Sequence, residues 1–406
     1  MIGRNNLRFS AVAAGLAIAT LSACGGGGSS PGGALPGGSN SITTGGVIGG
    51  GTPTPAPRRW TPTPPPTPTP VPTATPTPYP STSPQSLPIL TDNSQTNSGV
   101  FLGAVCTPQI PCSQFANTFR HGLAVGVVFL DWSSSLSQLF KWTEVGQWNS
   151  MGITPEITWK PTNLNLIDIA NGKYDSYIIS AAQTLKGLGY PVYMRPFHEF
   201  NGFWYSWGLP NQGASPQADA NFIAAWRHMV DTFRAQGATN VKFIWCFAGG
   251  SIHNPNAWDN PAAAYPGDSY VDWVGFDNYN RGTVNDQKHW LSFDNLNSGA
   301  YNLAVQIAPN KPVMWAEGAA NEYGDGGAMK GYWIQNMLNE LASPTNPYPH
   351  LREITWFELD PTPYMYDSLS STPAYTSFVW NMRSYNQNGV LNLRSNNQVF
   401  NSIVTP

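Results

Sequence analysis

The chain is poor in charge and in cysteine. Only 11% of its 406 residues are charged, and 20 basic and 23 acidic side chains leave a formal net charge of −3. Electrostatic binding to nucleic acid or to an anionic membrane needs a basic excess or a basic run, and neither is present. The four cysteines include no group with metal-ligand spacing. The composition therefore argues against partners of these kinds, and we expect no metal and no cofactor.

Aromatic residues, in contrast, are plentiful. They make up 13% of the chain and include 16 tryptophans. Flat aromatic faces combined with little charge suit a neutral, hydroxyl-rich ligand better than a phosphorylated one. The length is ample for one large core or for two domains.

The N-terminus has the features of an export signal. Arg4 and Arg8 precede an apolar run, 9–21, that is too short to span a bilayer permanently. The following Leu-Ser-Ala-Cys resembles the lipobox of bacterial lipoproteins, although an ordinary signal with a chance cysteine remains the alternative. We therefore predict a signal peptide over 1–23, lipidation of Cys24, and a protein anchored to a bacterial membrane and facing the periplasm or the cell surface.

A low-complexity segment follows. It is Gly- and Ser-rich over 25–51 and dominated by Thr-Pro repeats over 52–84. A segment of this composition cannot form a hydrophobic core, and its Thr-Pro part favours the extended polyproline II conformation. We assign 24–86 as a disordered tether and 87–406 as the folded domain, which we expect to be monomeric. In an oxidising compartment Cys106 and Cys112 could form a small-loop disulfide, a question the sequence leaves open.

The folded region alternates strand-like and helix-like segments. The strand-like apolar runs are Phe101–Cys106, Ala124–Leu130, Thr154–Trp159, Pro191–Glu199, Val241–Phe247, Tyr270–Asp277, Pro312–Glu317 and Glu353–Leu359. The helix-like segments are Leu139–Trp148, Tyr174–Leu188, an apolar stripe from Phe222 to Phe233, Ala328–Leu341 and Tyr375–Tyr385, whereas no clear helix follows the fifth strand. This pattern predicts an α/β fold, a (β/α)8 TIM barrel. An open doubly wound sheet is disfavoured because no Gly-rich phosphate fingerprint follows the first strand.

Two acidic residues lie at the positions where a (β/α)8 barrel carries its active site. Glu199 ends the predicted fourth strand and Glu317 the seventh, and active sites of such barrels lie at the carboxyl ends of the strands. A pair of carboxylates is what glycoside hydrolysis requires. Three further acids at strand ends, Asp131, Asp277 and Glu358, are expected to orient neighbours or to pair with cations such as Arg195.

The motifs around these acids resemble glycoside hydrolase family 26, retaining barrel enzymes whose best-known members are β-mannanases. The matching residues of strand four are Arg195, His198, Glu199, Asn201, Gly202 and Trp204. Strand six matches over 271–280, strand seven at Pro312, Val313, Glu317 and Gly318, and strand eight at Trp356 and Phe357. The resemblance covers 99–383.

The resemblance implies a role for each matched residue. Glu199 would be the proton donor and general base, and Glu317 the nucleophile. His198 and Asn201 would contact the substrate, Trp204 and Trp356 would stack on sugars, and Tyr279 would hydrogen-bond the nucleophile. Trp159 and Trp207 are further stacking candidates.

The implied substrate is a β-linked polysaccharide, and a β-1,4-mannan cleaved in an endo-acting manner is the first expectation. Tyr205-Ser206 and the residues after Glu317 depart from the mannanase pattern. Mixed-linkage β-glucan, β-1,3-xylan and an exopolysaccharide therefore stay open as substrates. A non-catalytic glycan-binding lipoprotein is the alternative from another class.

Overall fold

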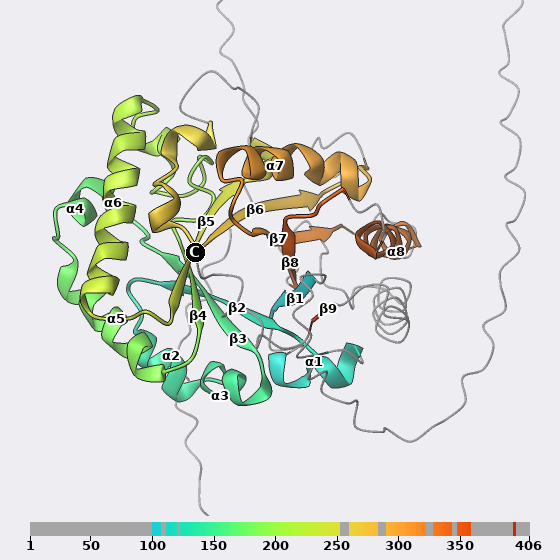
Figure 1. Cartoon of the computed structure of the whole chain (residues 1–406), viewed down its shortest axis with the longest axis horizontal. Helices are drawn as coiled ribbons and strands as arrows, with labels where there is room; N and C mark the ends of the chain where they lie inside the picture. Colours follow the sequence, from blue (N-terminus) through green and yellow to red (C-terminus); the bar gives the residue numbers. More distant parts are fainter. Residues whose placement is uncertain are drawn as a thin grey trace, which may run out of the picture. The chain divides into compact units, whose positions relative to one another are not determined.

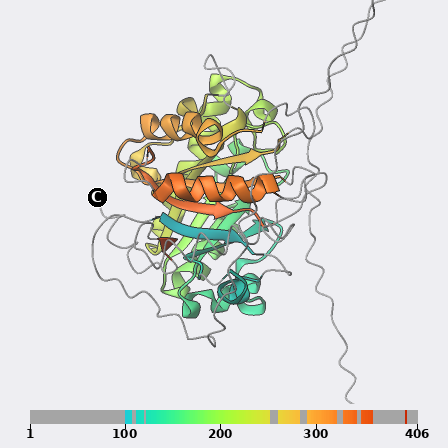
Figure 2. The same ribbon diagram turned by 90° about the vertical axis from the view of Figure 1, so that its right-hand side faces the viewer.

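Eight parallel strands close into a barrel. The computed structural model describes residues 100–106, 111–119, 122–251, 260–282, 290–321, 328–342, 347–358 and 393–394. The strand order is β2-β3-β4-β5-β6-β7-β8-β1, and β1 pairs back onto β2. Helices surround the ring of strands (Figure 1), and α8 runs along its outside (Figure 2). The predicted (β/α)8 barrel is confirmed.

The elements have the following bounds. The strands are β1 (Val100–Val105), β2 (Val125–Asp131), β3 (Thr154–Lys160), β4 (Val192–Pro196), β5 (Val241–Ala248), β6 (Trp273–Asn280), β7 (Val313–Ala320), β8 (Leu351–Trp356) and a two-residue β9 (Leu393–Arg394) paired with β1. The helices are α1 (Cys112–Phe119), α2 (Leu136–Trp142), α3 (Val145–Trp148), α4 (Leu166–Ala170), α5 (Asp175–Leu188), α6 (Pro216–Ala235), α7 (Phe293–Ile307) and α8 (Ala328–Ala342).

All eight predicted strands exist, but some boundaries were wrong. β4 ends at Pro196, three residues before Glu199, because Phe197 and Glu199 adopt positive φ values of 50° and 52°. β6 begins at Trp273 and continues to Asn280, so that Tyr279 lies inside the strand. The predicted helix Leu139–Trp148 is two helices, α2 and α3.

Other differences concern the helices. α1, α4 and α7 were not predicted, and the described residues between β5 and β6 form only 3₁₀ turns, in keeping with the weak helical signal there. The apolar stripe of α6 is buried as expected. The predicted signal peptide, Cys24, the tether and the helix Tyr375–Tyr385 lie outside the described residues. No helix in the described ranges is both long and apolar enough to cross a bilayer.

Local sequence chemistry sets several helix ends. Ser135, Asn165, Ser215 and Ser292 each precede a helix and accept a hydrogen bond from a backbone N–H of its first turn. α6 also carries proline at its first position, where the missing N–H is harmless. α5 ends at Gly189, whose left-handed conformation suits glycine.

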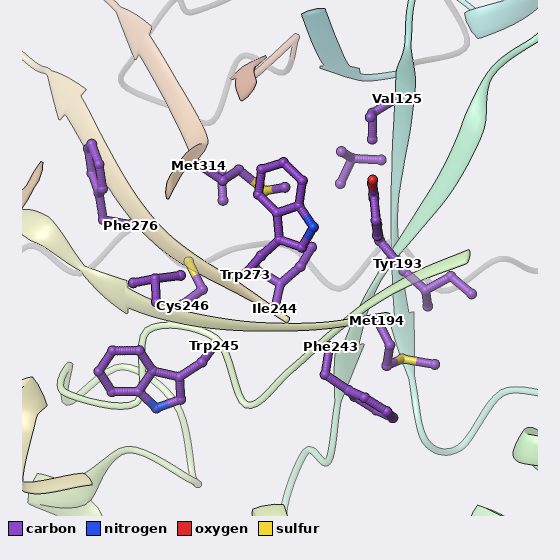
Figure 3. Packing of buried hydrophobic residues seen from close by; sticks show 14 of the residues in the cluster. Val125, Tyr193, Met194, Phe243, Ile244, Trp245, Cys246, Trp273, Phe276 and Met314 are labelled. Atoms are coloured by element: carbon purple, nitrogen blue, oxygen red, sulfur yellow. The ribbon is translucent and has the colours of Figure 1, made fainter. Parts of the chain in front are cut away.

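The strands are buried on both faces and separate two packing layers. Figure 3 shows Ile244 and Cys246 on one side of β5 and Phe243 and Trp245 on the other. Phe243 packs on Phe233 of α6, so its side of β5 faces the helices. Side chains of the opposite side, such as those of Ile244 and Cys246, fill the barrel interior.

The interior is polar where β1 meets β8. Glu353 and Thr355 of β8 are fully buried, and the Thr355 hydroxyl donates to Glu353 Oε1 at 3.1 Å. Gly103 of β1 faces this pair, and a Cβ there would lie 2.5 Å from Thr355 Oγ1 and 3.0 Å from Glu353 Oε1. The absence of a side chain at residue 103 therefore makes room for two polar groups inside the barrel.

We expect Gly103→Ala to lower the free energy of unfolding by about 1–3 kcal/mol, because the added methyl overpacks the interior. Urea unfolding would measure the loss. Gly187→Ala is the matched control, since a Cβ at this α5 position meets nothing within 4 Å and alanine is the better helix former. Equal stability of Gly103→Ala and the wild type would contradict the prediction.

Candidate active site

A buried arginine lies at the centre of the barrel mouth. Arg195 of β4 is fully buried and touches carboxylates from three other strands. Its Nη2 donates to Glu317 at 2.5 Å and its Nη1 to Asp277 at 3.0 and 3.1 Å, while Nε lies 2.8 Å from Glu156. The two outer nitrogens make hydrogen bonds to two different acids, so the guanidinium fixes the positions of both.

The electrostatics of this cluster favour a charged arginine. Burial opposes the positive charge of Arg195. The three neighbouring carboxylates outweigh this effect and raise the pKa of Arg195 well above its ordinary value, with the largest contribution from Glu317, followed by Asp277 and Glu156. Burial raises the pKa of Glu156 to about 7 against the opposing effect of Arg195. The expected pairing of Asp277 with Arg195 is confirmed.

An irregularity of the sheet orients Glu317. The register between β6 and β7 changes from Phe276↔Trp315 to Asp277↔Glu317, so one residue of β7, Ala316, has no partner in β6. Such a bulge re-aims the side chains that follow it. Here it sets Glu317 directly beside Asp277, where both carboxylates reach Arg195.

Glu317 is held by two donors. Besides Arg195, the hydroxyl of Tyr279 donates to its Oε2 at 2.6 Å. Burial and the charge of Glu317 raise the pKa of Tyr279 well above its ordinary value, so this hydroxyl keeps its proton. The two donors fix both oxygens of the Glu317 carboxyl group, which is only 5% exposed.

Glu199 lies just beyond β4 in a different environment. It is half-buried, and its N–H donates to the Cys246 carbonyl of β5 at 3.0 Å. The Trp204 indole donates to its Oε2 at 2.5 Å. Burial first, and then the nearby Glu317, raise the pKa of Glu199 to about 7, although the Trp204 hydrogen bond acts in the opposite direction. Glu199 can therefore hold or release a proton near neutral pH.

The turn that carries Glu199 is strained and is supported by its neighbours. The positive φ values of Phe197 and Glu199 are unusual for residues other than glycine. Asn201 ties the turn to β5, because its side chain donates to the Ala248 carbonyl and accepts from the Ala248 N–H. Trp207 donates to the His198 carbonyl at 2.8 Å. These contacts offset the strain and fix the carboxyl group.

His198 lies inside the same cluster. Its Nε2 is 3.0 Å from the Tyr205 hydroxyl, and its ring contacts those of Phe129 and Trp207. Burial, followed by the charges of Arg195 and Lys160, lowers the pKa of His198 well below its ordinary value. The imidazole is therefore neutral near pH 7.

The structure brings some of the predicted residues together and separates others. Glu199, Glu317, Trp204 and Tyr279 gather at the mouth, whereas His198 lies beside them but is fully buried, so its predicted substrate contact is not available in this arrangement. Asn201 has a structural role. Both polar atoms of its side chain are hydrogen-bonded to the backbone of Ala248, and the residue is only 2% exposed. A direct substrate contact by Asn201 is therefore not what this arrangement offers.

Three of the four predicted stacking tryptophans are buried. Trp159 is fully buried on the helix side of β3, against Tyr177 of α5 and Phe233 of α6. Trp207 is fully buried and stacks on Tyr205. Trp356 is 2% exposed and contacts Trp333 of α8. None of the three presents a ring face to a sugar here, and half-buried Trp204 is the candidate that remains.

Sequence reasoning missed four residues near the acids: Glu156, Phe129, Tyr205 and Lys160. The Phe129 ring lies 5.9 Å from the His198 ring and 6.2 Å from that of Phe357. The period-2 alternation of β2 and β3 could have identified Phe129, Glu156 and Lys160 as inward-facing. Tyr205 follows β4 in a loop, and no periodic signal marks it.

The structure also decides the state of the cysteines. Cys106 and Cys112 form a disulfide with a Cα–Cα distance of 5.3 Å, which links the end of β1 to the start of α1. Cys246 is free and buried, and its thiol donates to Asp277 at 3.2 Å. Across the described ranges, no three His, Cys, Asp or Glu side chains are grouped so that they could hold a metal ion.

Comparison with known sequences identifies the family. Residues 161–319 match Glycosyl hydrolase family 26. Endoglucanase H of Acetivibrio thermocellus is 37% identical over 257 residues, which are 62% of this chain and 27% of that protein. Mannan endo-1,4-beta-mannosidase A and B of Caldalkalibacillus mannanilyticus is 36% identical over 98 residues, 24% of this chain and 18% of that protein. The chain thus spans under a third of the length of these relatives.

Solved structures agree on the fold. The catalytic domain of an endo-beta-1,4-mannanase from Bacillus sp. JAMB-750 gives a TM-score of 0.54 at 17% identity, covering 70% of this chain and 86% of that one. A β-mannanase from Bacteroides ovatus gives 0.53 at 15% identity, covering 76% and 93%. A parallel (β/α)8 barrel with two glutamates at its mouth is an arrangement that glycoside hydrolysis can use. Over residues 161–319 the chain belongs to glycosyl hydrolase family 26.

We expect Trp204→Phe to raise the pKa of Glu199 above about 7, because the variant loses the indole hydrogen bond that favours the ionised carboxylate. Carboxyl ¹³C NMR titration would measure the change. Trp226→Phe is the control, since that indole donates to the Tyr270 carbonyl instead. A Glu199 pKa that is unchanged or lower in Trp204→Phe would refute the prediction.

Proposed function

We propose that the barrel hydrolyses β-glycosidic bonds of a polysaccharide by double displacement. The observation that carries this proposal is the contrast between its two glutamates. Glu317 accepts hydrogen bonds from the Arg195 guanidinium and the Tyr279 hydroxyl, whereas Glu199 has a pKa of about 7 and can be protonated. One ionised and one protonated carboxyl group are what a retaining glycosidase needs.

In the first step Glu317 forms a bond to the anomeric carbon while the bond to the leaving oxygen breaks. Glu199 gives its proton to that oxygen, which keeps charge from building up on the departing sugar. In the second step Glu199 takes a proton from water, and the water oxygen displaces Glu317 from the same carbon. Two inversions restore the original configuration, and we expect a carboxyl separation of about 5–5.5 Å.

The first substrate candidate is β-1,4-mannan cleaved in an endo-acting manner. The motifs of strands four and seven support it, as do several relatives named mannan endo-1,4-beta-mannosidase. These matches are short, however, and extend over 98, 106 and 113 residues.

A β-glucan is the second candidate, and one observation favours it. The match to Endoglucanase H extends over 257 residues at 37% identity, more than twice the length of the mannanase matches. Two shorter matches are to β-1,3-xylanases. The substrate therefore has to be measured among the three polymers.

We also retain export as a proposal. Arg4, Arg8 and the Leu-Ser-Ala-Cys24 sequence support a signal peptide and a lipid anchor, and the Thr-Pro repeats support a spacer between membrane and barrel. An anchored barrel on a spacer would suit an insoluble polymer. We propose a monomeric catalytic domain.

We expect reducing-sugar release by the full chain from at least one of mannan, mixed-linkage β-glucan and β-1,3-xylan. Glu199→Ala should lower the rate by about 10²–10⁴-fold, as for loss of a general acid, and Glu317→Ala should abolish turnover. ¹H NMR of the first product should show retained configuration. The control is Glu144→Gln, which alters an acid that binds α1 at Cys112 and Ser113.

An inverted product would disprove the double displacement. Binding to a polymer without release of sugar, equal in wild type and both glutamate variants, would identify a glycan-binding protein. Release from one polymer alone would identify the substrate and leave the mechanism in place.

The rate should also depend on pH in a defined direction. Glu199 must be protonated for the first step, so kcat/KM should fall as the pH rises through about 7. An aryl glycoside whose leaving group needs no proton should lose this alkaline limb for the first step. An alkaline limb that is the same for both substrates would assign the proton to another group.

A further inference from the structure

Lys160 places a positive charge at the barrel mouth next to the candidate active site. It is the last residue of β3, two positions after Thr158 and four after Glu156, which both face Arg195 inside the barrel. Strand alternation therefore directs Lys160 inward as well. Its Nζ lies 6.0 Å from the centre of the Phe129 ring.

Phe129 links this lysine to the catalytic cluster. The ring of Phe129 lies 5.9 Å from the His198 ring and 5.9 Å from the Arg195 guanidinium carbon. The charge of Lys160 reaches the same histidine, because it contributes to lowering the pKa of His198. Lys160, Phe129 and Arg195 thus lie near one another at the carboxyl ends of β2, β3 and β4.

The backbone of Lys160 is fixed, so its side chain has a defined origin. The Lys160 carbonyl accepts a hydrogen bond from the Trp132 N–H at 2.9 Å, and its Cα is paired with that of Asp131. Only the four-carbon stem can move, and it can reach from the rim toward a bound ligand.

The ammonium has no counter-ion in the described part of the chain. The neighbouring acid, Asp131, accepts from the Ser133 N–H instead. No ion pair or hydrogen bond of the Lys160 ammonium occurs among the described residues, in contrast to Arg195, which lies between three carboxylates. A contact with the Phe129 ring is worth about 0.5–1 kcal/mol and satisfies none of the three N–H donors.

A half-buried charge without a partner does not help the fold, because burial removes part of its hydration. Three free donors next to an aromatic ring match what a sugar presents, namely hydroxyl oxygens around an apolar ring face. We propose that Lys160 is a substrate-binding residue, whose ammonium donates to neighbouring hydroxyl oxygens of a sugar unit that lies against the half-buried Phe129 ring. This inference rests on the proposed glycoside hydrolase function.

Lys160→Met tests the proposal, because methionine keeps an unbranched apolar stem and removes the charge and the donors. We expect kcat/KM on the polymer that the wild type cleaves to fall by about 10- to 100-fold, the loss for one charged hydrogen bond to substrate. The thermal midpoint should stay equal or rise. Lys160→Arg should recover part of the activity.

Lys242→Met is the matched control. Lys242 is also a half-buried lysine on a barrel strand, but it is the second residue of β5 and lies toward the opposite end of the barrel. The Lys242→Met substitution should leave kcat/KM unaltered. An equal loss in both variants would overturn the assignment, and so would a fall in the thermal midpoint that accompanies the loss in Lys160→Met.

The outcomes separate this inference from the proposed function. If the wild type cleaves a polymer and Lys160→Met cleaves it equally well, the inference is wrong and the function stands. If the wild type cleaves nothing, the proposed function fails, and calorimetric titration of Glu199→Ala with mannohexaose and cellohexaose decides the binding role. Weaker binding by the Glu199→Ala/Lys160→Met double variant supports it, and equal or absent binding refutes it.

Discussion

The guanidinium of Arg195 is the interaction on which the site depends. It lies fully buried at the end of β4 and contacts acids from β3, β6 and β7. A buried charge is tolerated only when it is paired and hydrogen-bonded, and removal of one partner from such a cluster leaves an uncompensated charge. The acids and the arginine therefore require one another. The contacts that compensate the buried charges also fix the position of the Glu317 carboxyl group.

Much of the aromatic packing lies outside the barrel interior. Most large aromatic side chains near the strands, including Trp159, Phe233, Phe243 and Trp245, lie between the sheet and the helices. This outer layer supplies the hydrophobic burial that stabilises the fold. The interior combines apolar side chains such as Ile244 with polar groups, and Gly103 provides the space that Glu353 and Thr355 occupy.

The two glutamates differ because their surroundings differ. Glu317 faces a cation and a phenol, while Glu199 meets partial burial, an indole and the charge of Glu317. The strained turn after β4 brings Glu199 over the same opening to which the β7 bulge directs Glu317. Lys160 adds, on the neighbouring strand, a cation that has no counter-ion in the described part of the chain, which is why we propose a role in ligand binding.

The sequence alone determined the order of the eight barrel strands and the place of α6, because the apolar runs of parallel strands and the stripe of α6 are visible without contacts. It also singled out Glu199 and Glu317 by their position after such runs. It could not show that Trp159 and Trp207 are core residues. A tryptophan suits a sugar platform and a buried layer equally well, and only packing partners distinguish the two. The tertiary structure alone decided the bulge beside Glu317, the backbone role of Asn201 and the lack of a counter-ion for Lys160 among the described residues. Each of these depends on distances between residues far apart in the chain, which local sequence patterns do not specify.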